Sequence, residues 1–415
     1  MDRSAADDES IRSEVGAIVA AVRKDGDRAV RRFTERFDRV SAGSIAVPPA
    51  VLAESLRGLP APLRAALDRA ARNLTTAHRA MMPRPMEVET EPGILLCRTP
   101  VPVERVGVYV PGGRAAYPSS VLMGVIPARV AGCREVVVCS PPGADGLPAP
   151  VILAASALAG ADRVFAVGGA QAIAALAYGT ETIPRVDRIV GPGNEYVAQA
   201  KLAVANKVGI DNPAGPSELL VVADASASVD GVALELVAQA EHDPRAAVIA
   251  VVIGPADLAG RLAAALEARA AETPRSRVVK SALADRGALL TAESLAEAAE
   301  FANQYAPEHL LIATASPEAD QSLFRIAGAT FLGAASSVTF GDYLTGGNHV
   351  LPTGGMARSY SGLGTLDFIR WTSEQSVSPA AAMTLATDVA LLAAAEGLPA
   401  HAAAALAWQP TEVAR

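Results

Sequence analysis

Residues 106–142 read VGVYVPGGRAAYPSSVLMGVIPARVAGCREVVVCSPP, which joins two short apolar runs through a glycine turn and a helical stretch. The same alternation continues through residues 148–161, 163–180 and 187–206. Short apolar strands that alternate with helices are typical of βαβ units around a parallel sheet. The segment therefore predicts a doubly wound α/β domain, with its ligand site at the carboxyl ends of the strands.

A second α/β block follows the first one. Strand-like runs occur at residues 246–254, 309–315 and 328–335, and a helix with Asp230 as its N-cap is expected over 229–242. The chain is thus predicted to be α/β, with two doubly wound, incomplete Rossmann-like domains and a helical C-terminal tail. The expected boundaries are residues 1–108 with 226–364 for the first domain, 109–225 for the second, nucleotide-binding domain, and 365–415 for the tail.

The segments outside the two blocks also carry local signals. Residues 10–80 are expected to be mostly helical, with a break at Asp25–Gly26. A β-like run over 86–113 contains a turn at Pro92–Gly93, and 217–227 is interpreted as a strand that leaves the nucleotide-binding domain.

Composition limits the functional class. Hydrophobic residues make up 51% and charged residues 19% of the 415 positions, which is typical of a folded protein. The net charge is 36 − 44 = −8 without a basic stripe, which argues against nucleic-acid binding. The N-terminus lacks the apolar core of a signal peptide and no apolar stretch is long enough for a membrane span, so a cytoplasmic protein is expected. No CxxC pair occurs, and Cys97, Cys133 and Cys139 are expected to be buried.

Two segments could supply metal ligands. In AQAEHDP (238–244), Gln239 and His242 lie three residues apart near a helix end, so they could offer an amide oxygen and an imidazole nitrogen to one ion. The alternative is a polar helix end in which His242 favours the helix dipole. The glycine-rich loop FGDYLTGGNHVLPTGG (340–355) adds Asp342, a candidate oxygen ligand, together with His349.

Acid–base chemistry is indicated by YAPEHL (305–310), where Glu308 and His309 are adjacent. An exposed polar loop is the alternative for this segment. In EGLPAH (396–401), Glu396 and His401 flank a helix break, although a surface helix–turn–helix would look the same. Ser217 in NPAGPSE (212–218) has no nucleophile-elbow sequence, so a serine hydrolase is rejected.

Three glycine turns suggest nucleotide binding. GPGNEYV (191–197) follows an apolar strand and opens a helix, a place that favours anions. It is not the G-x-G-x-x-G fingerprint, because Tyr196 occupies the last glycine position. The turns PGGR (111–114) and GGAQ (168–171) give the same ambiguous signal, and ordinary βα turns are the alternative.

Together these segments resemble the histidinol dehydrogenase family over nearly the whole chain and in the family's order. The resemblance implies a four-electron oxidation of L-histidinol through L-histidinaldehyde to L-histidine, the last steps of histidine biosynthesis, with reduction of two NAD⁺ and one zinc per active site. It also implies an intertwined homodimer whose C-terminal tail serves the neighbouring site. The matching segments are YVPGG, LMGVIPARVAGC, VGGAQAIAALAYGTE, GPGN, PAGPSE, AQAEH, YAPEHL, FLG, GDY, NHVLPT and E-x-x-x-x-H.

The resemblance also assigns roles residue by residue. His309 would remove the alcohol proton, and Glu308 would activate the water that attacks the aldehyde. The implied zinc ligands are Gln239, His242, Asp342 and His401; the implied substrate contacts are these four with Ser217, His309, His349 and Glu396; the implied dinucleotide contacts are Tyr109, Gln171 and Asn194.

Other functions fit parts of this pattern. A paralogous zinc- and NAD-dependent dehydrogenase would act on another small polar alcohol, such as a sulfonated diol. A metabolite-binding protein would keep the fold without the catalytic pair, and a metallohydrolase would turn over without NAD.

Overall fold

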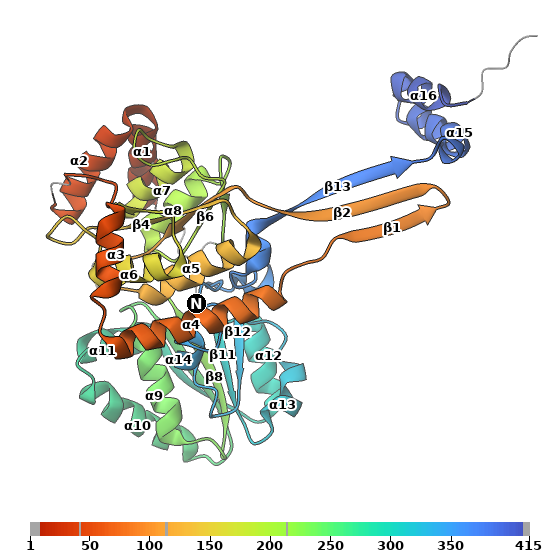
Figure 1. Ribbon diagram of the computed structural model, residues 1–415. Coiled ribbons are helices and arrows are strands. Elements are labelled where there is room, and N and C mark those ends of the chain that lie inside the picture. The colour runs from red at the N-terminus through yellow and green to blue at the C-terminus, as the bar shows by residue number, and fades with distance from the viewer. Residues whose placement is uncertain (1–8, 41–42, 113–114, 213–214, 410–415) are drawn as a thin grey trace, which may run out of the picture. The chain divides into compact units, whose positions relative to one another are not determined.

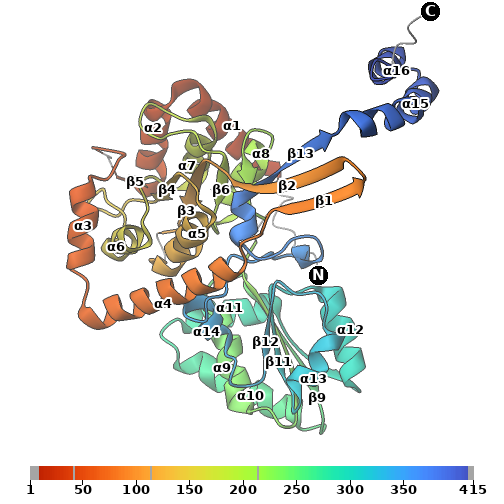
Figure 2. The ribbon, with the colours of Figure 1, turned by 45° about the vertical axis from the view of Figure 1, so that its right-hand side comes forward.

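A computed structural model describes residues 9–40, 43–112, 115–212 and 215–409. Its internal contacts divide the chain into two units, Met1–Met81 with Val103–Phe368 and Met82–Pro102 with Ile369–Arg415. The larger unit holds two five-stranded parallel sheets with helices on their faces (Figures 1 and 2), and the smaller one holds a three-stranded antiparallel sheet.

The first sheet is the one that residues 106–206 predicted. Its strand order is β5-β4-β3-β6-β7, so the chain reverses direction along the sheet between β3 and β6. Its strands are β3 (Arg105–Tyr109), β4 (Glu135–Ser140), β5 (Arg163–Ala166), β6 (Arg188–Val190) and β7 (Gly209–Ile210), and its helices are α5 (Pro118–Ala131), α6 (Pro150–Ala159), α7 (Gly169–Tyr178) and α8 (Glu195–Val204).

The second sheet repeats this order as β10-β9-β8-β11-β12. Two incomplete Rossmann-like sheets are therefore confirmed as the architecture of this unit. The strands are β8 (Glu218–Asp224), β9 (Ala247–Ile253), β10 (Gly287–Ala292), β11 (His309–Ala313) and β12 (Ala329–Leu332). The helices are α9 (Val229–Ala240), α10 (Leu258–Glu272), α11 (Ser276–Arg286), α12 (Leu295–Tyr305), α13 (Pro317–Asp320) and α14 (Val338–Tyr343), with short 3₁₀ turns at Gln321–Leu323, Met356–Arg358 and Thr365–Phe368.

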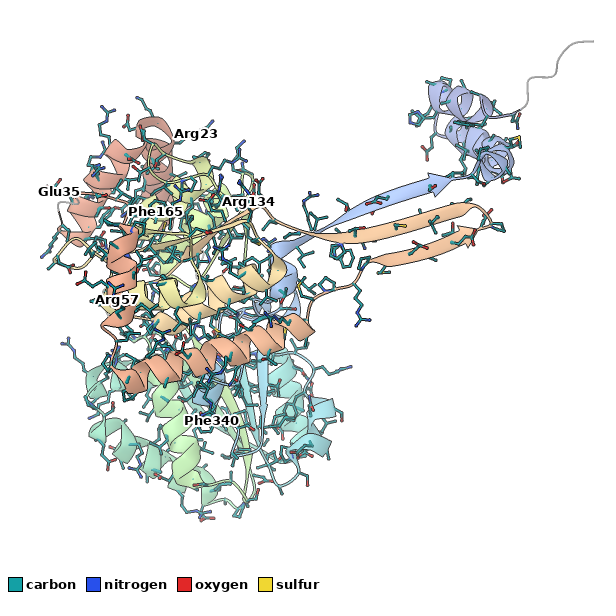
Figure 3. All side chains as sticks on the ribbon, in the orientation of Figure 1. Arg23, Glu35, Arg57, Arg134, Phe165 and Phe340 are labelled. Atoms are coloured by element: carbon teal, nitrogen blue, oxygen red, sulfur yellow. The ribbon has the colours of Figure 1, made fainter. Side chains whose placement is uncertain are left out.

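Close packing of α5 on the first sheet explains a glycine in that helix. A Cβ on Gly124 of α5 would lie 2.4 Å from Cγ1 of Val108, so only glycine lets α5 approach β3 this closely. On the other face, Phe165 is fully buried in a cluster that also contains Val15 and Ile173 (Figure 3). Both faces of the sheet are therefore covered, as a parallel sheet requires.

The N-terminal helices are α1 (Glu9–Asp25), α2 (Asp27–Asp38), α3 (Pro49–Arg57) and α4 (Ala61–Ala80), and the expected break at Gly26 is confirmed. Ile11, Val15 and Ile18 of α1 share one buried cluster with the first sheet. The sequence had grouped residues 1–108 with the second sheet instead. Helix α1 packs through an apolar stripe on one of its faces. The local pattern shows this stripe but does not show which sheet it packs against.

Two local expectations were wrong. The expected boundary at residue 225 put residues 218–224 in the nucleotide-binding domain, but they form β8, which pairs with β9 and β11 in the middle of the second sheet. The N-cap of α9 is Ser228, whose hydroxyl accepts a hydrogen bond from Gly231 N–H at 3.1 Å. Asp230 instead pairs with Arg269.

The smaller unit contains β1 (Met86–Glu91), β2 (Ile94–Pro102), β13 (Ile369–Val377), α15 (Pro379–Ala395) and α16 (Pro399–Leu406). The hairpin turn before Ile94 is confirmed, with Gly93 at φ 83°. The tail was expected to be helical from about residue 365, but β13 pairs with β2 along nine residues. The β-branched and aromatic residues of Ile369–Thr372 favour this strand.

Two further findings concern the three cysteines and the apolarity of the helices. Cys133 and Cys139 are buried, but Cys97 on β2 is only half-buried, with its Sγ 3.7 Å from Oε2 of Glu87. Among the described helices, none combines the length and apolarity needed to cross a membrane.

Candidate active site

A cavity of about 590 Å³ lies in the larger unit where the two sheets present their loops. Its walls combine the carboxyl ends of β3 and β6 with the amino ends of β8 and β11 and the end of α9. The first sheet thus contributes the carboxyl ends of its strands, where a ligand site was expected. The second sheet contributes the amino ends of its strands. The predicted site residues that line the cavity are Tyr109, Asn194, Ser217, Gln239, His242, Glu308, His309, Asp342 and His349.

The adjacent residues Glu308 and His309 are both held by the main chain of Glu218. Glu218 N–H donates to Oε2 of Glu308 at 2.7 Å, and Nδ1 of His309 lies 3.0 Å from the carbonyl oxygen of Glu218. Because a carbonyl only accepts, Nδ1 carries a proton, and Nε2 is the nitrogen that faces Asp342. Both side chains are buried, so the pair is positioned and not an exposed polar loop.

Charge around the pair shifts its protonation. Nε2 of His309 lies 3.6 Å from Oδ1 of Asp342. Burial lowers the pKa of His309, but the carboxylates Glu308 and Asp342 outweigh burial and raise that pKa to about 10. Burial would raise the pKa of Asp342, yet the hydrogen bond and the charge of His309 hold it below its usual value.

His349 is held by two contacts from different elements. Its Nδ1 lies 2.9 Å from the main-chain oxygen of Asp342, and its Nε2 lies 3.2 Å from Oγ of Ser120 on α5. Burial lowers the pKa of His349, so the ring is neutral in this setting.

Candidate metal donors converge on the same cavity. Gln239 is only 3% exposed in the last turn of α9, and His242 follows just after that helix. With Asp342 they offer an amide oxygen, an imidazole nitrogen and a carboxylate oxygen, a donor set that suits zinc but is one short of four. Within the described ranges, no three His, Cys, Asp or Glu side chains are grouped so that they alone could hold a metal ion.

Glu396 and His401 belong to the smaller unit. Glu396 caps the C-terminus of α15 and His401 lies in α16, and both are exposed. Within that unit, the described residues around them are themselves largely exposed.

The three candidate dinucleotide residues lie around the β3–β6 switch point. The Tyr109 hydroxyl accepts a hydrogen bond from Gly169 N–H at 3.2 Å, and burial raises the pKa of Tyr109 to about 12. Asn194 is the N-cap of α8 and accepts from Val197 N–H at 3.1 Å. Gln171, in the first turn of α7, is buried outside the cavity wall, and within the described part of the chain its Oε1 has no hydrogen-bond partner. An unsatisfied buried acceptor suits a ligand that donates hydrogen bonds. Of the glycine turns, residues 113 and 114 of PGGR lie outside the described ranges.

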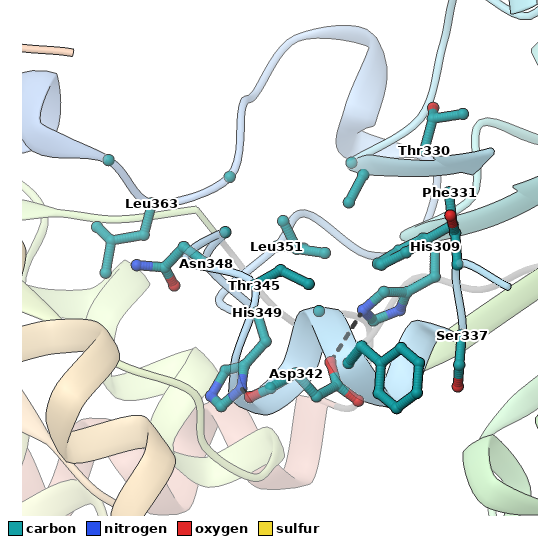
Figure 4. A pocket seen from close by; sticks show the side chains of 18 of the residues that line it. His309, Thr330, Phe331, Ser337, Asp342, Thr345, Asn348, His349, Leu351 and Leu363 are labelled. Carbon is teal, nitrogen blue, oxygen red and sulfur yellow. Dashed lines mark hydrogen bonds and ion pairs between the residues drawn. The ribbon is translucent and has the colours of Figure 1, made fainter. Parts of the chain in front are cut away.

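A second cavity of about 670 Å³ shares His309, Asp342 and His349 with the first one (Figure 4). Phe331 of β12 lies beside His309 there, with ring centroids 6.1 Å apart. A Cβ on Gly341 would lie 2.4 Å from the Phe331 ring, so the glycine lets α14 carry Asp342 up to that ring.

Several residues of the site were missed by sequence reasoning. Glu218 binds Glu308 through its N–H, and Oγ of Ser120 lies beside Nε2 of His349. The Thr353 hydroxyl accepts a hydrogen bond from Gly215 N–H. Thr353 lies in the glycine-rich loop 340–355, and Glu218 is the last residue of the PAGPSE segment. Their place in these motifs is the only sequence feature that indicates a role in the site.

Comparison with known proteins gives one consistent result. The histidinol dehydrogenase family model matches residues 1–407. The chain is 45% identical over 395 residues to a histidinol dehydrogenase of Methanosarcina barkeri, covering 95% of this chain and 91% of the relative. It is 47% identical over 405 residues to one of Dechloromonas aromatica, covering 97% and 93%. The crystal structure of histidinol dehydrogenase from Elizabethkingia anophelis superposes with a TM-score of 0.94 at 34% identity, covering 98% of this chain and 94% of that chain.

Proposed function

The chain belongs to the histidinol dehydrogenase family of oxidoreductases in histidine biosynthesis, and we propose that it performs the family's reaction with the residues of the 590 Å³ cavity. In this reaction, L-histidinol loses two electrons and two protons to give L-histidinaldehyde. Water adds to the aldehyde, and the hydrate loses two more electrons and two more protons to give L-histidine. Two NAD⁺ accept the two hydrides in turn. The observation that carries the proposal is the convergence of nine motif residues from both sheets on one cavity.

His309 is the proposed base for the alcohol. Its Nδ1–H is engaged by the Glu218 carbonyl, which leaves the Nε2 lone pair to take the hydroxyl proton. The charges of Glu308 and Asp342 raise the pKa of His309 to about 10. A cation on Asp342 would reduce that charge and bring His309 toward the neutral form that a base requires.

Glu308 is the proposed base for the hydration step. One carboxylate oxygen accepts from Glu218 N–H, which orients the group and leaves the other oxygen for a water molecule. A carboxylate held in this way can take the proton of the water that attacks the aldehyde.

Zinc is proposed to bind Gln239, His242 and Asp342 with His401 as the fourth ligand. The mixed nitrogen and oxygen donors fit this metal, and thiolates are not needed. When bound, the ion would hold the imidazole and amino groups of the substrate. Ser217, His349 and Glu396 are proposed to complete the substrate contacts.

NAD is proposed to lie along Tyr109, Gln171 and Asn194. The support is the switch point between β3 and β6, the start of α8 and the unpartnered Oε1 of Gln171.

A homodimer is proposed to complete the site. The smaller unit exposes large apolar side chains, among them Leu391 at 65%, Leu392 at 68% and Trp408 at 61%. Apolar side chains grouped in this way are typical of protein interfaces. A second copy of the chain would cover them, and its Glu396 and His401 would serve this cavity. The cytoplasmic location and the absence of nucleic-acid binding stay predictions of the sequence.

The alternative substrate, another small polar alcohol, is not favoured, because the curated relatives at 45–47% identity are named histidinol dehydrogenase. Neither a hydrolase nor a metabolite-binding protein agrees with the family match.

The test is an assay of purified protein with L-histidinol, NAD⁺ and zinc in which NADH and histidine are followed together. We expect two NADH per histidine, loss of both products with a chelator, and recovery with zinc. NADH from a sulfonated diol but none from L-histidinol would replace the proposed substrate. Zinc-dependent turnover without NAD⁺ would overturn the proposal.

A further inference from the structure

A buried ion pair lies directly beneath the GPGN turn, outside the residues assigned to the reaction. Lys201 of α8 is 2% exposed and Asp211, just after β7, is 6% exposed. Nζ of Lys201 lies 2.5 Å from Oδ1 of Asp211. Ion pairs this deeply buried lose much of their attraction to the cost of removing both charges from water. Stability alone is therefore a poor reason for this pair.

Both members bind the same residue of the turn. Lys201 donates to the main-chain oxygen of Gly191 at 2.5 Å, and Gly191 N–H donates to Oδ2 of Asp211 at 2.7 Å. The two side chains and Gly191 thus form a closed ring of three hydrogen bonds. Asp211 is also tied to the sheet, because its N–H donates to the main-chain oxygen of Ile189 at 3.2 Å.

The backbone conformation and the position of Gly191 are both tightly constrained. Its φ is 116°, in the region that favours glycine, and a Cβ there would lie 2.0 Å from the main-chain oxygen of Tyr109. The turn therefore passes immediately beside the end of β3. Where Gly191 sits decides where Pro192, Gly193 and Asn194 line the cavity.

We propose that Lys201 and Asp211 are positioning residues for the dinucleotide, which hold the Gly191 peptide so that the GPGN turn and the start of α8 meet the anionic pyrophosphate. The inference rests on the proposed binding of NAD at this switch point. Neither side chain touches the cofactor. They act because Lys201 joins the last turn of α8 to the Gly191 peptide that leaves β6, so the turn and helix α8 cannot move independently.

The test uses variants that leave no charge unpaired. K201M/D211L replaces both side chains by hydrocarbon of similar size, and K201M/D211N keeps a side-chain oxygen for Gly191 N–H. The matched control is R269M/D230L, which removes an exposed ion pair on α9 and α10. Thermal unfolding establishes that each variant is folded. Calorimetric titration with NAD⁺ gives its dissociation constant, and steady-state kinetics at saturating NAD⁺ give the KM for L-histidinol.

We expect K201M/D211L to weaken NAD⁺ binding at least tenfold, K201M/D211N to weaken it less, and the control to bind as wild type. The KM for L-histidinol should stay within twofold in all three. Wild-type NAD⁺ affinity in a folded K201M/D211L, or in K201M/D211N if the former does not fold, would overturn the inference. An equal loss for NAD⁺ and L-histidinol would overturn it too, as general damage. If the wild-type protein itself bound no NAD⁺, the proposed function would fail, and the inference with it.

Discussion

Nδ1 of His309 lies 3.0 Å from the carbonyl oxygen of Glu218, and the N–H of the same Glu218 donates to Glu308. One residue at the start of β8 therefore orients both proposed bases, His309 as the first residue of β11 and Glu308 just before it. The register of these two strands, in which His309 is paired with Leu219, places the Glu218 peptide beside them.

The two bases should be separable by variant. His309→Gln is expected to lower kcat for the alcohol by about 10²–10⁴-fold, the usual contribution of a general base. Glu308→Gln is expected to keep the first NADH of a single turnover and to lose most of the second. Rapid-mixing absorbance with L-histidinol, and then with the aldehyde as substrate, measures both. A Glu308→Gln enzyme that oxidises the aldehyde at the wild-type rate would remove the role proposed for Glu308.

Sharing of the site between subunits has a direct complementation test. Homodimers of His309→Gln and of His401→Gln should both be nearly inactive. Because the proposed site takes its two histidines from different chains, a mixed dimer would then hold one site with both of them intact. Mixing, unfolding and refolding the two variants should therefore restore activity. Absence of restored activity in isolated mixed dimers would place His309 and His401 of one chain in the same site.

Gly341 is expected to be intolerant of a methyl group. Gly341→Ala would bring Cβ to 2.4 Å from the Phe331 ring, and overpacking of this kind costs about 1–3 kcal/mol. Urea unfolding should show the loss, and kcat should fall because the ring lies beside His309. Adding Phe331→Leu should restore much of the stability. The control is Gly16→Ala on α1, where no atom lies within 4 Å and a gain of about 0.5–1 kcal/mol is expected.

Asp38 should make stability depend on pH. Burial raises its pKa from 3.8 to about 6, and its Oδ2 has no hydrogen-bond partner among the residues that the structure describes. The folded protein therefore binds more protons than the unfolded chain between these values, and stability falls as pH rises through this window.

Asp38→Asn is expected to stabilise the protein by about 1–2 kcal/mol at pH 7.5, allowing for solvent screening, and by almost nothing at pH 4. Denaturant unfolding at both values measures this difference. Asp257→Asn, at an exposed carboxyl paired with Arg261, serves as the control. An equal gain at both pH values would show that the charge of Asp38 is not the cause.

Much of the fold and of the candidate site could be predicted because the signals are local. The strands β3 to β6 follow from apolar runs that end in glycine turns, and α8 follows from the GPGN segment. Glu308, His309, Gln239 and His242 were found because each lies beside a partner in a short motif. These patterns depend on neighbours within a few residues, so the chain itself records them.

Other features depend on contacts between distant segments. The sequence of β8 reads as an apolar strand in either sheet, and only pairing with β9 and β11 places it at the centre of the second one. The strand β13 exists because β2 supplies its partner about 270 residues earlier. Glu218 is an ordinary glutamate in the sequence, and its role comes from the main chain that the register of β8 and β11 brings to His309. Residue type and periodicity therefore determined which chemistry and which class of fold this chain carries. Long-range strand pairing and helix packing determined which side chains meet, because no local pattern encodes the partner across the sheet.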